Sequence, residues 1–384
     1  MKILQVISAG FEQGGAENNI VAIKKNLKKQ GHTVKILSSD IKPEIKHFSD
    51  YEFKSIPSSG IKKLFFSFFN LHAYKVTKKV LKEFKPDIVL LNTMMQPTAS
   101  VLFLLKKYPT ILFVHGPEIF TTSLLPWYLP VTNYKNGSFK LKDLTFYGKL
   151  SYIYNRYLCG LLYKFGLKNV DKMVALSNYT FEFLKKEGYD PIYIPNGAKL
   201  LKPTPINSKN PSLLYAGRLE KFKGVDDLIK ALSIIKKQIP SITLTIAGTG
   251  SYEKNLIQLT HALKLQNSIN FLGHLNQKQL AEEYKKCTIL VMPSTWPETF
   301  GKVGIEAMSV GRPVIATNVG GVKDWLIDGI NGMLVEPHRP DQIAMKVIKI
   351  LTNERLLKSM VKSGQMNAKK FSIENHVNHL KKFL

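Results

Sequence analysis

The chain has 384 residues, of which 44% are hydrophobic, and its 55 Lys and Arg outnumber its 28 Asp and Glu to give a net charge of +27. This length exceeds what one hydrophobic core usually absorbs, so two domains are expected. The two cysteines, Cys159 and Cys287, exclude a disulfide framework, and no apolar run approaches the ~20 residues needed to cross a bilayer. A cytoplasmic protein is expected, with peripheral binding to the inner face of the cytoplasmic membrane as an alternative.

The positive charge is spread evenly, with an excess of +14 in residues 1–198 and +13 in residues 199–384. A general lysine bias explains such a distribution best. Attraction to an anionic membrane surface is the second interpretation. Nucleic acid is not expected as a partner, because no recognisable nucleic-acid-binding module accompanies the charge.

The first half of the chain alternates apolar runs of strand length with helical patterns. A strand at Lys2–Ser8, a glycine-bearing loop, a helix over 18–31 and a strand at Thr33–Ser39 form a βαβ unit. Further strands are expected at Pro86–Asn92, Pro109–Gly116, Val170–Ser177 and Pro191–Gly197. Because Val, Ile and Leu dominate these runs, they predict a parallel sheet covered on both faces, in a domain of residues 1–197.

Residues 61–85 place apolar side chains on one stripe of a predicted helix beside several lysines. The stripe consists of Ile61, Leu64, Phe65, Phe68, His72 and Val76. Packing against the core of the domain is the favoured interpretation, and contact with a membrane interface is the alternative. The segments Ser123–Val131 and 145–166 are expected to add hydrophobic contacts, either at the edge of a binding cleft or inside the domain.

A proline-rich stretch without periodicity, residues 198–210, predicts a linker. A second alternating series follows in a domain of residues 211–368. Its strands are expected at Ser212–Leu219, Ile242–Gly248, Ile269–Gly273, Thr288–Ser294 and Pro313–Asn318. The fold class is therefore α/β, with two doubly wound domains in tandem whose ligands bind beyond the carboxyl ends of the strands.

The strand ending at Ser294 is followed by a loop and by a helix expected to begin near Lys302. The first amides of a helix have no partner within it and carry the positive end of its dipole, so they form an anion site. These amides belong to Phe300, Gly301, Lys302 and Val303. Glu298 lies on the loop and Glu306 inside the helix, so the two carboxylates are expected to contact different parts of the bound molecule.

Two cations follow the first strand of the second domain. Arg218 offers a fork to oxygen pairs and Lys223 a point charge, so together they suit a diphosphate; solvated surface charges are the alternative. Gly250 lies in a short glycine turn after the next strand, which serves either as a tight turn or in phosphate binding. It does not complete a dinucleotide fingerprint.

In the first domain, Gly15 opens a predicted helix, and its glycine-bearing loop either cradles a phosphate or caps that helix. His115 closes a predicted strand and is expected to reach the binding cleft, although a lone histidine is more often structural. The sequence contains neither an Asp-x-Asp motif at a strand end nor a histidine cluster. No metal cofactor is therefore expected.

With these residues placed, the sequence resembles the retaining glycosyltransferases of family 4, also called group 1. That family has the GT-B fold, in which two Rossmann-like domains face each other across a cleft. The resemblance covers essentially the whole chain and rests on "GGAE" at 14–17, "GRLEKFKG" at 217–224, "IAGTG" at 246–250, and "ETFGKVGIE" at 298–306 followed by "GRPVIATNVGG". It also implies that residues 369–384 form a closing helix that crosses back to the first domain.

The resemblance implies a role for each candidate residue. Glu306 would bind the ribose of a nucleotide sugar, Glu298 the transferred sugar, and Arg218 and Lys223 the diphosphate, aided by the amides at the start of the helix. His115 would lie beside the sugar, Gly15 near the phosphate or the acceptor, Gly250 in the nucleotide site, and the segment Phe271–His274 around the nucleobase. Metal independence is implied as well.

The expected function is retaining transfer of a hexose or N-acetylhexosamine from a nucleoside-diphosphate sugar, with UDP favoured, to a hydroxyl of a saccharide or lipid-linked saccharide. Synthesis of a cell-surface polysaccharide or glycolipid would use such a reaction. A nucleotide-sugar epimerase and a non-catalytic nucleotide-binding subunit are the alternatives. The sequence departs from the family pattern at Ala198 and Lys199, and after His115, where no nearby Asp follows.

Overall fold

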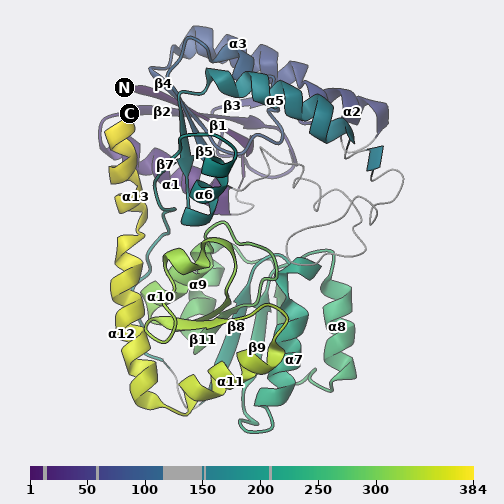
Figure 1. Cartoon of the computed structure of the whole chain (residues 1–384), viewed down its shortest axis with the longest axis vertical. Helices are drawn as coiled ribbons and strands as arrows, with labels where there is room; N and C mark the ends of the chain where they lie inside the picture. Colours follow the sequence, from purple (N-terminus) through teal and green to yellow (C-terminus); the bar gives the residue numbers. More distant parts are fainter. Residues whose placement is uncertain (12–14, 58–59, 116–148, 151–152, 207–209) are drawn as a thin grey trace. The chain divides into compact units, whose positions relative to one another are not determined.

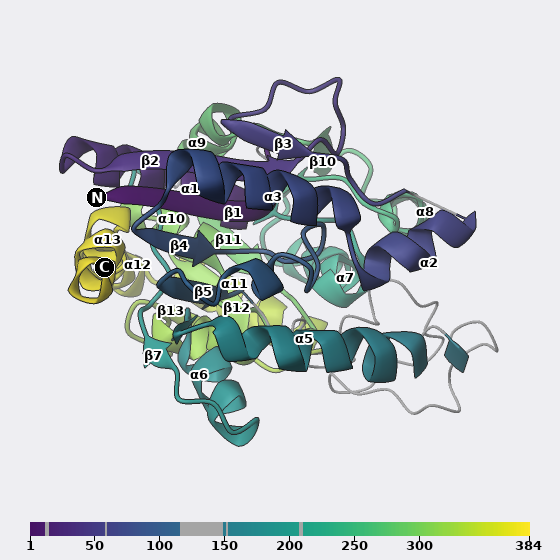
Figure 2. The ribbon, with the colours of Figure 1, turned by 90° about the horizontal axis from the view of Figure 1, so that it is seen from above.

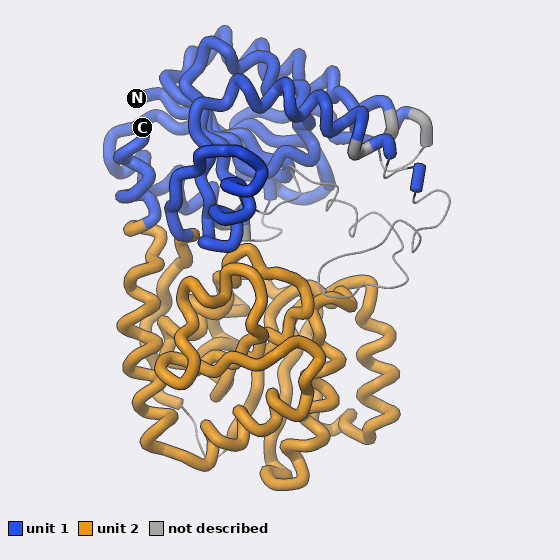
Figure 3. The backbone as a smooth tube through the Cα atoms, viewed as in Figure 1, with its two compact units in different colours: residues 1–195, 376–384 blue, residues 196–375 orange. Residues whose placement is uncertain are grey.

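The computed structural model describes residues 1–11, 15–57, 60–115, 149–150, 153–206 and 210–384. These residues form two units, shown in different colours in Figure 3. Unit 1 contains Met1–Pro195 and His376–Leu384, and unit 2 contains Asn196–Asn375. Each unit has its own parallel sheet and its own core, so the expected fold class of two Rossmann-like α/β domains is confirmed.

Unit 1 is built on a seven-stranded sheet in the order β3-β2-β1-β4-β5-β6-β7, and all its strand pairs are parallel. The strands are β1 (Lys2–Ala9), β2 (Thr33–Ser39), β3 (Tyr51–Phe53), β4 (Ile88–Leu91), β5 (Thr110–Val114), β6 (Lys172–Ala175) and β7 (Ile192–Tyr193). Every residue of β4 and β5 is buried, which requires cover on both faces of the sheet. Figure 2 shows β3, β2, β1, β4 and β5 in this order.

The helices of unit 1 lie between these strands in the chain. They are α1 (Gly15–Lys29), α2 (Gly60–Phe68), α3 (Leu71–Phe84), α5 (Gly160–Gly166), α6 (Asn178–Lys186), the short turns η1 (Leu102–Leu104) and η6 (Leu167–Asn169), and the π-helical turn η5 (Tyr154–Cys159). The segment Ser123–Val131 lies outside the described residues, and so does most of 145–152.

The single helical stripe expected over 61–85 is wrong, because the helix breaks between α2 and α3. Asn70 adopts an extended backbone, and its side chain accepts a hydrogen bond from the Ala73 amide, which caps the start of α3. Its amide group also donates to the Gln96 carbonyl at 2.9 Å. An asparagine favours a cap over a helix interior because its side chain competes for backbone groups. The aligned stripe therefore does not exist.

Unit 2 is built on a six-stranded parallel sheet in the order β10-β9-β8-β11-β12-β13. The strands are β8 (Ser212–Ala216), β9 (Thr243–Ala247), β10 (Ile269–Gly273), β11 (Ile289–Met292), β12 (Val314–Thr317) and β13 (Gly332–Val335). In order of appearance this is 3-2-1-4-5-6, the arrangement of dinucleotide-binding sheets. The chain therefore leaves β8 and β11 in opposite directions across the sheet.

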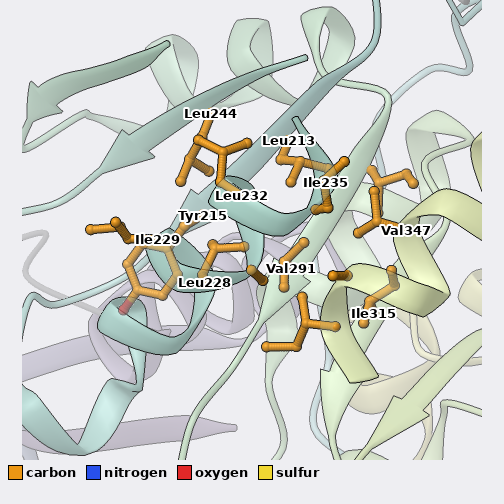
Figure 4. Packing of buried hydrophobic residues seen from close by; sticks show 14 of the residues in the cluster. Leu213, Tyr215, Leu228, Ile229, Leu232, Ile235, Leu244, Val291, Ile315 and Val347 are labelled. Atoms are coloured by element: carbon orange, nitrogen blue, oxygen red, sulfur yellow. The ribbon is translucent and has the colours of Figure 1, made fainter. Parts of the chain in front are cut away.

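The helices of unit 2 are α7 (Val225–Ile235), α8 (Glu253–Ala262), α9 (Gln277–Lys286), α10 (Lys302–Val310), α11 (Pro340–Leu351) and α12 (Glu354–Lys370), with the short turns η7 (Lys221–Lys223) and η8 (Gly320–Asp324). Figure 1 labels most of these elements, and Figure 4 shows Leu228, Leu232 and Ile235 of α7 packed among strand residues. Val225, Leu228, Ile229 and Leu232 have the spacing of one helical face, which explains why this sequence folds as a helix on the sheet.

The stretch 198–210, expected as a linker, belongs to unit 2 in its described part. The Ala198 amide donates to the Phe371 carbonyl at 2.9 Å, and the Thr204 amide donates to the Val310 carbonyl at 3.1 Å. The last helix, α13 (Ile373–Leu380), begins in unit 2, and residues from His376 onward belong to unit 1. There His376 Nδ1 lies 2.9 Å from the Pro195 carbonyl oxygen.

Within the described residues, none of the helices has the length and apolar character needed to cross a membrane.

Candidate functional site

The candidate site of unit 2 lies where β8 and β11 end. The two strands are neighbours in the sheet, and their chains continue in opposite directions, so their carboxyl ends mark the switch point of the sheet. Ligands of such sheets bind at this position. The loop after β8 carries Arg218 and Lys223, and the loop after β11 carries Glu298 and leads into α10.

Backbone contacts hold these two loops together. The Thr295 amide donates to the Phe222 carbonyl at 2.8 Å, and the Thr295 hydroxyl donates to the same oxygen at 3.1 Å. Gly224 has a left-handed backbone with φ 65°, and a Cβ at this position would collide with the Pro293 carbonyl. A side chain there would force the loops apart, so the glycine allows Lys223 to approach the second loop.

Lys223 and Glu298 form an ion pair in which Nζ and Oε1 are 2.5 Å apart. Both side chains are largely buried, with 17% and 19% exposed. Burial by itself raises the pKa of the Glu298 carboxyl, but the ammonium of Lys223, the Ser294 hydroxyl and the charge of Arg218 hold that pKa below its ordinary value. Glu298 is therefore an anion at neutral pH, next to two cations.

The start of α10 supplies backbone donors beside this pair. Gly301 is the residue before the helix and has a left-handed backbone with φ 81°; it offers no side chain to cap the first turn. The Trp325 indole donates to the carbonyl of Phe300, and Phe300 itself is buried. This bond fixes the backbone just before the amides of Lys302 and Val303, which keeps them pre-oriented for an anion.

Glu306 lies in the second turn of α10, and a buried tyrosine orients it. The Tyr284 hydroxyl donates to Glu306 Oε2 at 3.0 Å. Burial raises the pKa of Glu306, and this rise is partly offset by the charges of Lys302 and Lys199 and by the tyrosine hydrogen bond. Lys199, in the stretch where the sequence departs from the family pattern, thus acts electrostatically on Glu306.

The two carboxylates therefore lie in different environments. Glu298 carries a lowered pKa and an ion pair, while Glu306 carries a raised pKa and a hydroxyl partner. The expectation from the sequence that they contact different parts of the bound molecule stays a prediction.

Two glycines after β12 support the Glu298 loop, and sequence reasoning assigned them no role. The Gly321 amide donates to the Glu298 carbonyl at 2.7 Å. Gly320 has φ 56°, and a Cβ there would lie 2.7 Å from the Glu298 amide nitrogen and closer to the carbonyl oxygen. The signal that could have identified them is the glycine pair of "NVGG", which follows a buried strand directly.

Gly250 and His274 follow the next two strands along the sheet. A Cβ at Gly250 would lie 2.5 Å from the Leu219 carbonyl carbon, so this glycine allows the loop after β9 to pack on the loop that carries Arg218. His274 follows β10 and its side chain is exposed. In the sheet, β9 and β8 lie between β10 and β11, so His274 and Glu298 do not follow neighbouring strands.

The remaining two candidates, Gly15 and His115, belong to unit 1. Gly15 begins α1 after β1, and His115 follows β5, so both lie at the carboxyl edge of the same sheet. His115 Nε2 is 3.5 Å from Oδ1 of Asn92, which is buried and follows the neighbouring strand β4. Asn92 is a polar neighbour of His115 that sequence reasoning missed, because it lies 23 residues away in the chain.

Among the residues that the structure describes, no group of three or more His, Cys, Asp or Glu side chains is placed to hold a metal ion.

Comparisons with known proteins place the chain in a family. Residues 198–367 match the model of the glycosyl transferases group 1, and residues 13–200 match that of glycosyltransferase family 4. An uncharacterized glycosyltransferase of Methanocaldococcus jannaschii is 32% identical over 245 residues, which cover 62% of this chain and 66% of that protein. Glycogen synthase of Mycobacterium tuberculosis is 36% identical over 139 residues, or 36% of this chain and 33% of the synthase. In each case the aligned region spans less than two thirds of the relative.

Solved structures share the fold at low sequence identity. The sucrose-phosphate synthase of Thermosynechococcus elongatus aligns with a TM-score of 0.78 at 19% identity and covers 99% of this chain and 97% of its own. HepE of Anabaena, in complex with UDP and glucose, aligns with a TM-score of 0.71 at 20% identity and covers 100% and 98%. Because the two family models adjoin and together span most of the sequence, the chain belongs to the group 1 glycosyltransferases of the family 4 type.

Proposed function

We propose that this protein transfers a hexose or an N-acetylhexosamine from a nucleoside-diphosphate sugar, with UDP as the favoured nucleotide, to an acceptor hydroxyl with retention of configuration. The observation that carries the proposal is the Lys223–Glu298 ion pair beside the start of α10, at the switch point of a dinucleotide-type sheet. The HepE structure that shares the fold contains UDP and glucose.

The ion pair suggests how the donor would rearrange the site. Lys223 neutralises Glu298 in the described structure, and the diphosphate of a bound donor would compete for that ammonium. Transfer of Lys223 to the phosphate would release the Glu298 carboxylate for hydroxyl groups of the sugar. Arg218 and the amides of Lys302 and Val303 would share the phosphate charge, which grows as the diphosphate departs, and stabilisation of that leaving anion is a large catalytic contribution.

Glu306 would accept hydrogen bonds from the ribose hydroxyls of the same donor. Its carboxylate is already oriented by the Tyr284 hydroxyl, so little reorganisation is needed on binding. With no metal in the proposal, the cations and helix amides alone receive the leaving group. The incoming hydroxyl would attack on the face from which the diphosphate departs, which retains the anomeric configuration.

The acceptor is proposed to be a saccharide or a lipid-linked saccharide used in cell-surface polysaccharide or glycolipid synthesis. In this proposal Gly15 would lie near the phosphate or the acceptor, and His115 would lie beside the transferred sugar.

Thermal stabilisation by a panel of UDP-, GDP- and ADP-sugars tests donor binding. A donor at 100 times its dissociation constant should stabilise the protein by about 2.7 kcal/mol. The variant Lys223→Gln should lose most of this effect, while Lys221→Gln, which changes an exposed lysine on the same loop, should keep it. Equal stabilisation of both variants would remove Lys223 from the donor site.

Stereochemistry tests the reaction itself. Proton NMR of the product should show the same anomeric configuration as the donor, and chelation of divalent metals should leave the rate unchanged. An inverted product would contradict the retaining mechanism. Formation of an epimer from the donor without an acceptor would instead favour the epimerase alternative.

A further inference from the structure

The outer face of the helical segment 153–166, which contains η5 and α5 of unit 1, is unusually apolar. Ile153, Tyr157, Leu158, Leu161 and Phe165 are each more than half exposed, with Tyr157 at 65%. Residues 153, 157, 161 and 165 follow one another at intervals of four, so they share one side of the helical segment. A helix on the surface of a globular domain normally shows polar residues on its outer side.

The inner face of the same segment is anchored to the domain. Cys159 is buried, and the Tyr163 hydroxyl donates to the Met94 carbonyl at 2.8 Å. Leu162 and Tyr163 pack against the core of unit 1. The segment, whose α5 part can be followed in Figure 2, therefore carries apolar residues toward the core and also away from it.

Helix α2, the neighbour of η5, carries a further exposed apolar residue. Cys159 Sγ lies 3.9 Å from the Ser67 carbonyl oxygen, which places α2 next to η5. Phe65 of α2 is 64% exposed. Phe65, Ile153, Tyr157, Leu158, Leu161 and Phe165 are called the apolar face below. So large a group of exposed apolar side chains normally marks an interaction site.

The two segments of the chain that contain the apolar face have basic residues and no acidic ones. The segments 54–82 and 149–168 contain no Asp or Glu. Lys62, Lys149, Lys164 and Lys168 are exposed, and Lys168 Nζ lies 5.4 Å from the centre of the Phe165 ring. Lysines beside apolar residues can keep their ammonium groups in the headgroup region while their stems lie along the hydrocarbon boundary.

We propose that the apolar face is a docking surface for an anionic lipid bilayer, with its apolar side chains in the interface and its lysines on the lipid headgroups. A second copy of this chain is the weaker candidate for the same face. Each copy carries a net charge of +27, so two basic faces brought together would repel. An anionic bilayer provides both an apolar interior and the opposite charge.

The apolar face differs from the membrane-binding stripe expected over 61–85, which the break at Asn70 rules out. The proposal does not depend on the transferase reaction. Of the two residues of α3 that were part of that expectation, Val76 packs against the core, and His72 is exposed and stacks on Phe66. The membrane-facing residues come instead mainly from η5 and α5.

Sedimentation with vesicles tests the proposal. Vesicles of phosphatidylcholine alone are compared with vesicles of an equimolar mixture of phosphatidylcholine and phosphatidylglycerol. We expect binding to the mixed vesicles, weaker binding as the ionic strength rises, and little binding to phosphatidylcholine alone. Absence of binding to the mixed vesicles, or equal binding to both kinds, would overturn the proposal.

Two double variants and one matched control locate the surface. Leu161→Glu with Phe165→Glu should weaken binding at least about tenfold, and Lys164→Gln with Lys168→Gln should weaken it and reduce its salt dependence. The control, Ile257→Glu with Met345→Glu, changes exposed apolar residues of α8 and α11 in unit 2 and should bind as the unaltered protein does.

Each variant is first checked for an unchanged unfolding midpoint and unchanged stabilisation by a nucleotide sugar, so that loss of folding is not mistaken for loss of docking. Wild-type binding by the Leu161→Glu, Phe165→Glu variant would refute the assignment. A dimer of the unaltered protein that this variant dissociates would also refute it, in favour of a second copy of the chain.

Discussion

Gly304 in the first turn of α10 faces the ring of Trp325 so closely that an alanine there should disturb both stability and donor binding. A Cβ at Gly304 would lie 2.8 Å from Cζ2 and Cζ3 of the indole, and closer still to Cη2. Trp325 is only 1% exposed, and its indole is also bonded to the Phe300 carbonyl. The ring therefore cannot move aside without loosening the backbone that precedes the amides of α10.

The expected cost follows from a comparison with a second helical glycine. At Gly364 in α12, the nearest heavy atom to a new Cβ would be Met308 Cγ at 3.4 Å, which is ordinary contact. Replacing a helical glycine by alanine gains up to about 1 kcal/mol, and this gain applies to both sites. Overpacking of a core costs about 1–3 kcal/mol, so the two variants should differ in the free energy of unfolding by about that amount.

Denaturant and thermal unfolding of Gly304→Ala and Gly364→Ala measure the difference. In a unit of this size each kcal/mol shifts the unfolding midpoint by about 2–4 °C. Gly364→Ala should be as stable as the unaltered protein or more so, while Gly304→Ala should be less stable than Gly364→Ala and less stabilised by a UDP-sugar. Equal midpoints and equal donor effects for the two variants would refute the steric argument.

Three further outcomes are expected. Tyr284→Phe removes the hydroxyl that orients Glu306. A hydrogen bond to a charged group contributes about 1.5–3 kcal/mol, so the affinity for the nucleotide sugar, measured by titration calorimetry, should fall about tenfold or more. An unchanged affinity would exclude an orienting role for Tyr284. Arg312→Met removes the donor from several buried carbonyls, and each unpaired carbonyl costs about 1–3 kcal/mol. Chemical denaturation should therefore show a decrease of at least about 3 kcal/mol in the free energy of unfolding. A smaller decrease would mean that burying the guanidinium costs nearly as much free energy as its hydrogen bonds contribute. The folded-state pKa of Glu298 is lowered, so the stabilisation by its ion pair with Lys223 is present above the ordinary carboxyl pKa and is lost as the pH falls through the folded-state pKa. Lys223→Gln should weaken the dependence of the unfolding free energy on acidic pH. An unchanged pH profile of stability would contradict the role of Lys223 in lowering this pKa.

Local sequence was sufficient to place the main parts of the site. The run that ends at Ser294, the glycine at 301 and the helical pattern after it predicted a helix beginning near Lys302, and α10 begins at Lys302. The same reasoning assigned Glu298 to the loop and Glu306 to the helix. These predictions succeed because they depend on contacts between residues close in the chain.

The partners of those residues were not predictable in the same way. Lys223 is 75 residues from Glu298, and Tyr284 is 22 residues from Glu306. Their pairing depends on β8 and β11 lying side by side and on α9 packing next to α10. The break at Asn70 was missed for a related reason. The apolar period of the sequence continues across Asn70, whereas the cap depends on the Asn70 side chain and on its contact with the loop that contains Gln96.

By itself, the sequence determined the alternation of strands and helices, since burial imposes a period on each local segment, and it determined where α10 begins. Only the tertiary structure decided which strands are neighbours, and so which loops meet at the switch point of unit 2. The order of a parallel sheet is set by pairings between distant segments, and the backbone hydrogen bonds of those pairings are the same whatever the side chains are. No local pattern records that order, so the ion pair of Lys223 with Glu298 and the apolar face of η5 and α5 became visible only in the folded chain.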